Sequence, residues 1–308
     1  MPAAITHRAR PPFLGVDRPN PREGRRAGEI GPSGEAGPTE SPSRNESDHH
    51  GGVLQRVVVQ VVTILAYALD LVAVLIWPPL TLLVLLATWP FDRNRKVAGR
   101  FYRYLAVIWS RSFPFWRIRV EGKWPAGRSA YVVVANHQSF LDVFALCNIH
   151  REMKWVAKQS LFRIPMFGWG MSLAGDISLA RGDPQSALEV MTKAQRYLES
   201  GMNVMIFPEG SRSEDGTLLP FKPGAFKLAV GAGVPILPVV VCGSAQGMPK
   251  GSPWARPAKV TIRILEPVPT IGLRGRDVRK LRDDVHNRIA RALDAAELSA
   301  PPPVMPPC

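Results

Sequence analysis

A histidine and an aspartate five residues apart form the first group in this sequence that could do chemistry. His137 and Asp142 follow an apolar run at residues 131–135, and such a run is typical of a strand buried on both faces. Ligands of α/β proteins usually bind at the carboxyl ends of such strands. On a regular helix the two side chains would point about 140° apart. We therefore expect His137 in a loop and Asp142 early in the next helix.

If the two side chains meet, they form a general base with a carboxylate that orients it. The carboxylate would accept one ring N–H, fix the tautomer, and stabilise the imidazolium that forms when the other ring nitrogen takes a proton from a substrate hydroxyl. A single pair of this kind also arises by chance, so it is a weak signal alone.

A second group follows the apolar run at residues 204–207, and its members are Glu209, Gly210, Ser211 and Arg212. A loop with glycine, hydroxyls and arginine suits a phosphate group, and Lys222 and Lys227 follow it. The alternative is a solvated turn with a Glu–Arg ion pair. Arg181 adds a basic group after another apolar run, at residues 177–180.

Short apolar runs alternate with helical stretches between these groups, which predicts an α/β domain. The expected strands are residues 116–121, 131–135, 154–157, 177–180, 204–207, 236–241 and 259–265. The expected helices are residues 141–149, 185–200, 224–232 and 276–298. Residues 97–113 predict one more helix, which either lies on a membrane interface or packs in the core with a basic face outward.

Residues 53–89 are apolar enough for a membrane, since Arg56 and Asp70 are their only charges. The segment is too long for one span of about 20 residues and slightly short for two. Trp77-Pro78-Pro79 lies where a break would fall, and a helical hairpin inserted from one face is favoured over one tilted span, because Asp70 is costly at the bilayer centre. A buried core helix of a soluble domain is the third possibility.

Four parts of the chain follow from these patterns. Residues 1–52 are rich in proline and glycine and are expected to be a disordered tail, and residues 53–90 to be a membrane anchor. Residues 91–300 form the expected catalytic domain, and residues 301–308 a disordered C-terminus.

The net charge of +14 belongs entirely to residues 51–308, which favours anionic partners of any kind. The basic cluster after the apolar segment places the downstream domain on the cytosolic side. Cys147, Cys242 and Cys308 lack the spacing of a disulfide framework or a structural zinc site, so no metal is predicted.

Four blocks taken in order carry a resemblance to a known family. NHQSFLD, GDISLAR, FPEGSRS and VPILPV, with the sequence between them, resemble the glycerolipid acyltransferases, specifically the bacterial 1-acyl-sn-glycerol-3-phosphate acyltransferases, over about residues 92–268. The resemblance implies the family's mixed α/β sheet flanked by helices, here preceded by a membrane-inserted helical segment.

Roles for individual residues follow from the resemblance. His137 would be the general base and Asp142 its orienting carboxylate. Substrate would be bound by Asn136, Arg181, Glu209, Gly210, Ser211 and Arg212. Glu209 would position Arg212 or a glycerol hydroxyl, because its charge repels phosphate. The second block departs from the family pattern at Ser178, Leu179 and Ala180, which leaves the acceptor's identity open.

The reaction implied is transfer of an acyl chain from acyl-CoA or acyl-carrier protein to the free hydroxyl of lysophosphatidate, giving phosphatidate. No cofactor is expected beyond the donor, and the partners are membrane lipids and the two substrates, with no nucleic acid. The expected location is a membrane, the bacterial inner membrane, with the catalytic domain on the cytosolic face. The alternatives are an acyltransferase with another acceptor, such as glycerol 3-phosphate, another lysophospholipid or a lyso-ornithine lipid, and an inactive protein that binds membrane surfaces.

Overall fold

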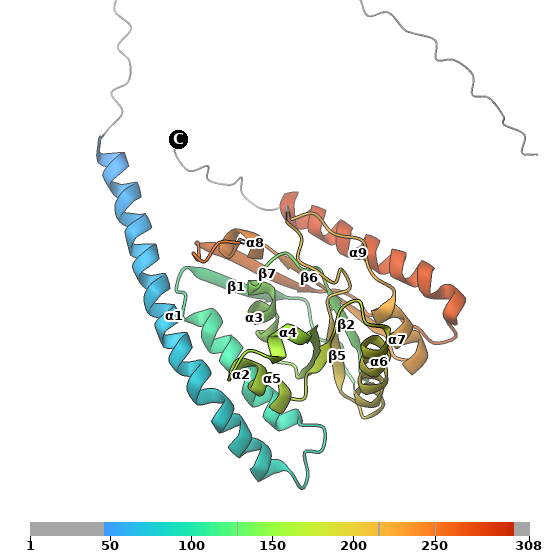
Figure 1. Cartoon of the computed structure of the whole chain (residues 1–308). Helices are drawn as coiled ribbons and strands as arrows, with labels where there is room; N and C mark the ends of the chain where they lie inside the picture. Colours follow the sequence, from blue (N-terminus) through green and yellow to red (C-terminus); the bar gives the residue numbers. More distant parts are fainter. Residues whose placement is uncertain (1–45, 128, 215, 250, 299–308) are drawn as a thin grey trace, which may run out of the picture. The chain divides into compact units, whose positions relative to one another are not determined.

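A mixed sheet with helices on both faces forms the body of the molecule (Figure 1). The computed structural model describes residues 46–298, apart from residues 128, 215 and 250. Within them the strands are β1 (Trp116–Glu121), β2 (Val132–Ala135), β3 (Met153–Lys158), β4 (Ile177–Leu179), β5 (Asn203–Ile206), β6 (Ile236–Cys242) and β7 (Ala258–Ile264). All the predicted strands are present, and the predicted fold class is confirmed.

The strand order places the chemistry-bearing loops side by side. The sheet runs β1-β7-β6-β2-β5-β3-β4, and its pairs are parallel except for β6 with β7. The carboxyl ends of β2, β5, β3 and β4 therefore lie at one edge.

The described helices are α1 (Glu46–Thr88), α2 (Lys96–Arg111), α3 (Leu141–Cys147), α4 (Gln159–Phe162), α5 (Phe167–Leu173), α6 (Pro184–Glu199), α7 (Gly224–Ala232), α8 (Ser244–Gly247), the 3₁₀ turn η1 (Gly275–Asp277) and α9 (Val278–Leu298). The short helices α4, α5 and α8 were not predicted.

Alternate residues of the central strands face two cores, as the pleat requires. Val133 and Ala135 of β2 pack with α2 and α3, whereas Val132 and Val134 pack with the face covered by α6, α7 and α9. This burial on both faces explains why the strands are continuous apolar runs.

The turn between α1 and α2 caps the start of α2 and is hydrogen-bonded to the sheet. The carboxylate of Asp92 accepts the backbone N–H groups of Lys96 and Val97, each at 2.7 Å, which satisfies free donors at the helix start. The buried Lys154 of β3 donates to the carbonyl of Arg95 at 2.8 Å. The turn between α1 and α2 is thus bonded to the sheet at β3.

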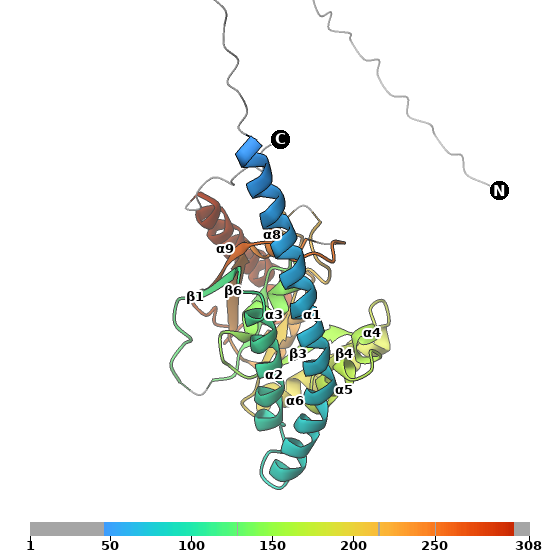
Figure 2. The ribbon, with the colours of Figure 1, turned by 90° about the vertical axis from the view of Figure 1, so that its left-hand side faces the viewer.

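Helix α1 is continuous through Pro78 and Pro79, so the break that a hairpin needs is absent and the favoured hairpin was wrong. Contacts with α2 hold the helix across the prolines: the ring of Trp77 stacks on Phe101 with centroids 4.8 Å apart, and its Nε1–H donates to the Phe101 carbonyl at 2.9 Å. Figures 1 and 2, at right angles, both show α1 beside α2. Long-range packing of this kind overrides the local signal of the prolines.

One side of α1 faces the domain and the other is apolar and exposed. Ala66 and Asp70 are buried, and the Asp70 carboxylate accepts a hydrogen bond of 3.3 Å from Ser112, the residue after α2. Leu65, Leu69, Leu83 and many other apolar side chains stay exposed. Among the described residues α1 alone is long and apolar enough, over Gln55–Thr88, to cross a membrane by length and composition.

Residues 46–52, assigned to the tail, belong to α1, whereas residues 1–45 and the predicted C-terminal tail at 301–308 lie outside the described residues.

Candidate active site

The loop after β2 brings His137 and Asp142 together. His137 lies in the loop and Asp142 in the first turn of α3, and the His137 Nδ1 lies 2.8 Å from the Asp142 Oδ2. That oxygen also accepts the backbone N–H groups of Gln138 at 2.7 Å and Ser139 at 2.9 Å. The carboxylate therefore folds the loop and fixes the ring at once, and it favours the tautomer with the proton on Nδ1.

The two side chains of this pair differ in how deeply they are buried. The Asp142 side chain is fully buried, whereas that of His137 is 14% exposed. The Asp142 Oδ1 is buried without a partner in the described part of the chain, so the imidazole is the one side chain that shares the carboxylate's charge there. A charged aspartate in this position stabilises an imidazolium.

Phe207 supports the histidine ring, a contact that the sequence analysis missed. It follows β5, and its ring stacks on that of His137 with centroids 4.0 Å apart and planes 14° apart. Trp155 of β3 lies beyond Phe207, with centroids 6.0 Å apart. Phe207 is the first residue of the FPEGSRS block, but an aromatic residue at that position is equally typical of the hydrophobic core, so the sequence did not predict its contact with His137.

Glu209 holds the peptide of His137. Its Oε1 accepts the His137 N–H at 2.7 Å and its Oε2 accepts the Leu219 N–H at 3.1 Å, and the residue is only 4% exposed. Burial raises the pKa of Glu209 to about 7, although the two backbone hydrogen bonds act in the opposite direction. Both oxygens are thus engaged by the backbone, where the sequence predicted a contact with Arg212 or substrate.

Asn136 is likewise engaged inside the fold. Its side-chain amide donates to the Val241 carbonyl and accepts the Val241 N–H, both at 2.8 Å, and the residue is buried. The side chain thus extends the pairing of β2 with β6 by one residue. Asn136 was predicted to bind substrate; in the fold both polar atoms of its side chain are bonded to Val241.

The rest of the loop after β5 curves around His137. The Ser213 N–H donates to the His137 carbonyl at 2.9 Å, so Ser211 and Arg212 lie between two residues bonded to the histidine. Gly210 has φ +74°, and a Cβ there would lie 2.8 Å from the Lys222 Nζ. The backbone conformation therefore favours glycine, whereas the end of the lysine side chain could shift to admit a Cβ.

Arg181 shares the edge but lies farther away. It follows β4, which is separated from β2 by β5 and β3, so three strand spacings of about 4.8 Å place it roughly 14 Å from the end of β2. Lys158 at the end of β3, exposed and not predicted, stands between them. The exposed Lys227 lies on α7.

These groups define what the site can do. A partly exposed imidazole with a buried carboxylate behind it can take a proton from a hydroxyl and return it to a leaving group. Arg212 and Lys222 beside it can bind an anion.

Comparison with known proteins agrees with this geometry. A protein-family model described as Acyltransferase matches residues 117–242, which include both the His137 loop and the loop after β5. The chain is 34% identical over 209 residues to a chloroplastic 1-acyl-sn-glycerol-3-phosphate acyltransferase of Brassica napus, covering 66% of this chain and 58% of that protein. The chain thus spans little more than half the length of this relative.

Two further proteins are similar over more of their length. A human 1-acyl-sn-glycerol-3-phosphate acyltransferase beta is 36% identical over 63% of this chain and 69% of its own. The crystal structure of the 1-acyl-sn-glycerophosphate acyltransferase PlsC from Thermotoga maritima superposes with a TM-score of 0.65 at 28% identity, covering 80% of this chain and 98% of that one. The chain therefore belongs to the acyltransferase family that includes the 1-acyl-sn-glycerol-3-phosphate acyltransferases.

Proposed function

We propose that this protein transfers an acyl chain from a thioester donor, acyl-CoA or acyl-carrier protein, to the free hydroxyl of 1-acylglycerol 3-phosphate. The observation that carries the proposal is the hydrogen bond of 2.8 Å between His137 and Asp142 at the carboxyl edge of the sheet. The similarity to proteins named 1-acyl-sn-glycerol-3-phosphate acyltransferase supports the choice of acceptor.

In the proposed step His137 acts through Nε2. This nitrogen takes the proton of the acceptor hydroxyl while the hydroxyl oxygen attacks the thioester carbonyl. When the carbon–sulfur bond breaks, the thiolate takes that proton from the imidazolium. Asp142 accepts the Nδ1–H hydrogen bond throughout and stabilises the positively charged ring. Because the acceptor oxygen attacks the thioester directly, no acyl-enzyme forms, and the histidine returns to its starting state.

The acceptor's phosphate is proposed to bind between the loop after β5 and the end of β3. Arg212 and Lys222 lie on the first, and Lys158 ends the second. Arginine offers paired donors that match phosphate oxygens, and lysine adds a point charge. Glu209 and Asn136 act behind this surface, because their polar atoms are bonded to the backbone of His137, Leu219 and Val241.

The acceptor is tested with a panel of substrates. Purified protein is given palmitoyl-CoA with lysophosphatidate, glycerol 3-phosphate, lysophosphatidylcholine or a lyso-ornithine lipid, and thiol release is followed. The proposal expects release with lysophosphatidate well above the others and phosphatidate as product. Preference for another acceptor would contradict the proposal that lysophosphatidate is the substrate. Thiol release without any acceptor would contradict the proposed transfer to a hydroxyl.

We further propose that the outer side of α1 inserts into one leaflet of a membrane. The inner side packs on the domain at Ala66, Asp70 and Trp77, so α1 cannot cross a bilayer without drawing α2 in with it. An in-plane helix buries the exposed leucines in lipid while the domain stays in water. The sn-1 chain of the acceptor would then stay in that leaflet during the reaction.

Charge substitution tests the membrane placement. Leu65 and Leu83 are exposed on α1 (64% and 61%), and Leu188 is equally exposed (62%) on α6. Leu65→Glu with Leu83→Glu should sharply reduce flotation with phosphatidylcholine vesicles, whereas Leu188→Glu should not. Equal flotation of all three proteins would contradict the placement.

A further inference from the structure

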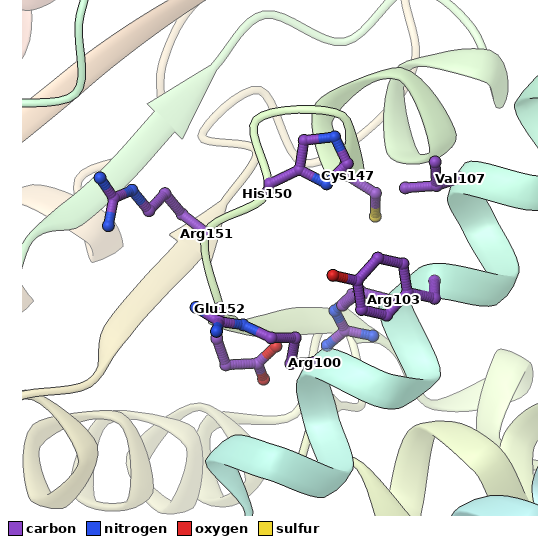
Figure 3. Close-up of a pocket in the computed structure, with 8 residues that line it drawn as sticks. Arg100, Arg103, Val107, Cys147, His150, Arg151 and Glu152 are labelled. Carbon is purple, nitrogen blue, oxygen red and sulfur yellow. The ribbon is translucent and has the colours of Figure 1, made fainter.

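A pocket rich in arginine lies at the edge of the sheet opposite the proposed active site. Its volume is about 260 Å³, and α2 forms one side and the connection from α3 to β3 the other (Figure 3). The charged or titratable residues on its lining include Arg100, Arg103, His150, Arg151 and Glu152. Glu152 directly precedes β3, whereas His137 follows the carboxyl end of the parallel β2, so the pocket is separate from the catalytic groups.

The positive charges of this pocket exceed the negative charges that pair with them in the described part of the chain. Glu152 is bonded to Lys154 at 3.0 Å and Arg103 to Asp176, so these two pairs cancel. Arg100 and Arg151 form no ion pair with the other described residues; the guanidinium of Arg151 lies 5.8 Å from the ring of Trp124. The pocket therefore has a surplus of positive charge, which attracts an anion.

Two buried polar atoms at its wall point to the kind of ligand. The Nε–H of Arg103 and the Oε2 of Glu152 have no hydrogen-bond partner in the described part of the chain. The first needs an acceptor and the second needs a donor. A phosphodiester whose headgroup also carries a hydroxyl supplies both, whereas a dianionic phosphate would be repelled by Glu152.

The pocket also adjoins a surface suited to lipid. At 100° per residue, Val97, Tyr104 and Ile108 lie about 40° to 80° around α2 from Arg100. All three are exposed; Tyr104 itself lines the pocket, and Val97 and Ile108 lie between the pocket and Phe101, which contacts α1. A leaflet that covers the outer side of α1 and this stripe would bring its phosphate groups to the pocket.

We infer that this pocket binds the headgroup of an anionic membrane phospholipid, a phosphodiester with a hydroxyl such as phosphatidylglycerol. Arg100 and Arg151 bind the phosphate at the mouth, and Arg103 and Glu152 bond the headgroup deeper in. The inference rests on the membrane placement proposed above for α1, and it adds a second lipid site that does not take part in acyl transfer.

The test compares two pairs of arginines on vesicles. Binding of the full chain is measured on phosphatidylcholine vesicles with and without a minority of phosphatidylglycerol. One variant carries Arg100→Gln and Arg151→Gln. The control carries Arg111→Gln and Arg119→Gln, which removes equal charge; Arg111 lies on the same side of α2 as Arg100 but outside the pocket. Melting curves confirm that both variants are folded.

We expect phosphatidylglycerol to strengthen binding of the wild type and of the control, and the pocket variant to lose about tenfold or more of that gain. Equal losses in the two variants would show diffuse attraction and overturn the inference. It would equally be overturned if inorganic phosphate alone stabilised the wild type and not the pocket variant, since that result assigns the pocket to free phosphate. His137→Ala should keep the lipid preference, so loss of acyl transfer and loss of this site are distinguishable.

Discussion

The carboxylate of Glu209 accepts the backbone N–H of His137 at 2.7 Å, so a residue expected to bind substrate holds the peptide of the proposed general base. Its other oxygen bonds the Leu219 N–H, which ties three separate segments together. The position of the imidazole is therefore set by two carboxylates: Asp142 bonds the ring and Glu209 the backbone.

Glu209→Gln should leave one of these buried N–H groups facing an amide NH₂ and reduce stability by about 1–3 kcal/mol. It should also change how stability depends on pH. The pKa of Glu209 is about 7 in the fold, against about 4.3 for an exposed glutamate. The folded state holds this proton more tightly, so Glu209's contribution is complete below about pH 4.3 and is lost as the pH rises through about 7.

Melting temperatures between pH 5 and 8 provide the check. The wild type should lose more stability across this range than Glu209→Gln. Identical slopes for the two proteins would contradict the raised pKa.

Asn136→Ala should lower kcat and stability but leave the KM for lysophosphatidate nearly unchanged. The reason is that its amide bonds Val241 and not the substrate; two buried backbone groups lose their partners, at a cost of about 1–3 kcal/mol each. Steady-state kinetics and thermal unfolding measure the effect. A rise in KM with unchanged stability would instead assign Asn136 to substrate binding.

Phe207→Leu should lower kcat by up to about tenfold, because the ring stacked on His137 at 4.0 Å is lost and such contacts stabilise by about 0.5–1.5 kcal/mol. Phe207→Tyr keeps the ring and is the control, with near-normal activity expected. If the leucine and tyrosine variants had the same kcat, the stack would have no part in catalysis.

Arg212→Ala should raise the KM for lysophosphatidate by about ten- to a hundredfold, since a charge-assisted hydrogen bond contributes about 1.5–3 kcal/mol. Arg181→Ala should have a smaller effect, because Arg181 stands three strands from His137. Initial-rate kinetics over a range of lysophosphatidate concentrations compare the two. The reverse order of effects would place the phosphate at the β4 end of the edge.

The sequence was sufficient for features that depend on local pattern. Apolar runs bounded by turns located every described strand, and the spacing of His137 and Asp142 required the loop and helix start that the structure has. These features follow from burial on two faces and from the period of a helix.

Features that depend on distant contacts could not be predicted. The continuity of α1 at Pro78 and Pro79 depends on Trp77 packing against α2, and the true partners of Asn136 and Glu209 lie 105 and 72 residues away in the chain. In each case the residue type showed that a polar or aromatic contact was needed, but only the packed sheet specifies the partner.

The most direct test of the account measures thiol release from palmitoyl-CoA, with and without lysophosphatidate, for the wild type, His137→Ala and Asp142→Asn. We predict release by the wild type that requires lysophosphatidate, near-complete loss in His137→Ala, and a large loss in Asp142→Asn, which no longer stabilises the imidazolium. Lysophosphatidate-dependent release that persists in a folded His137→Ala protein would contradict it.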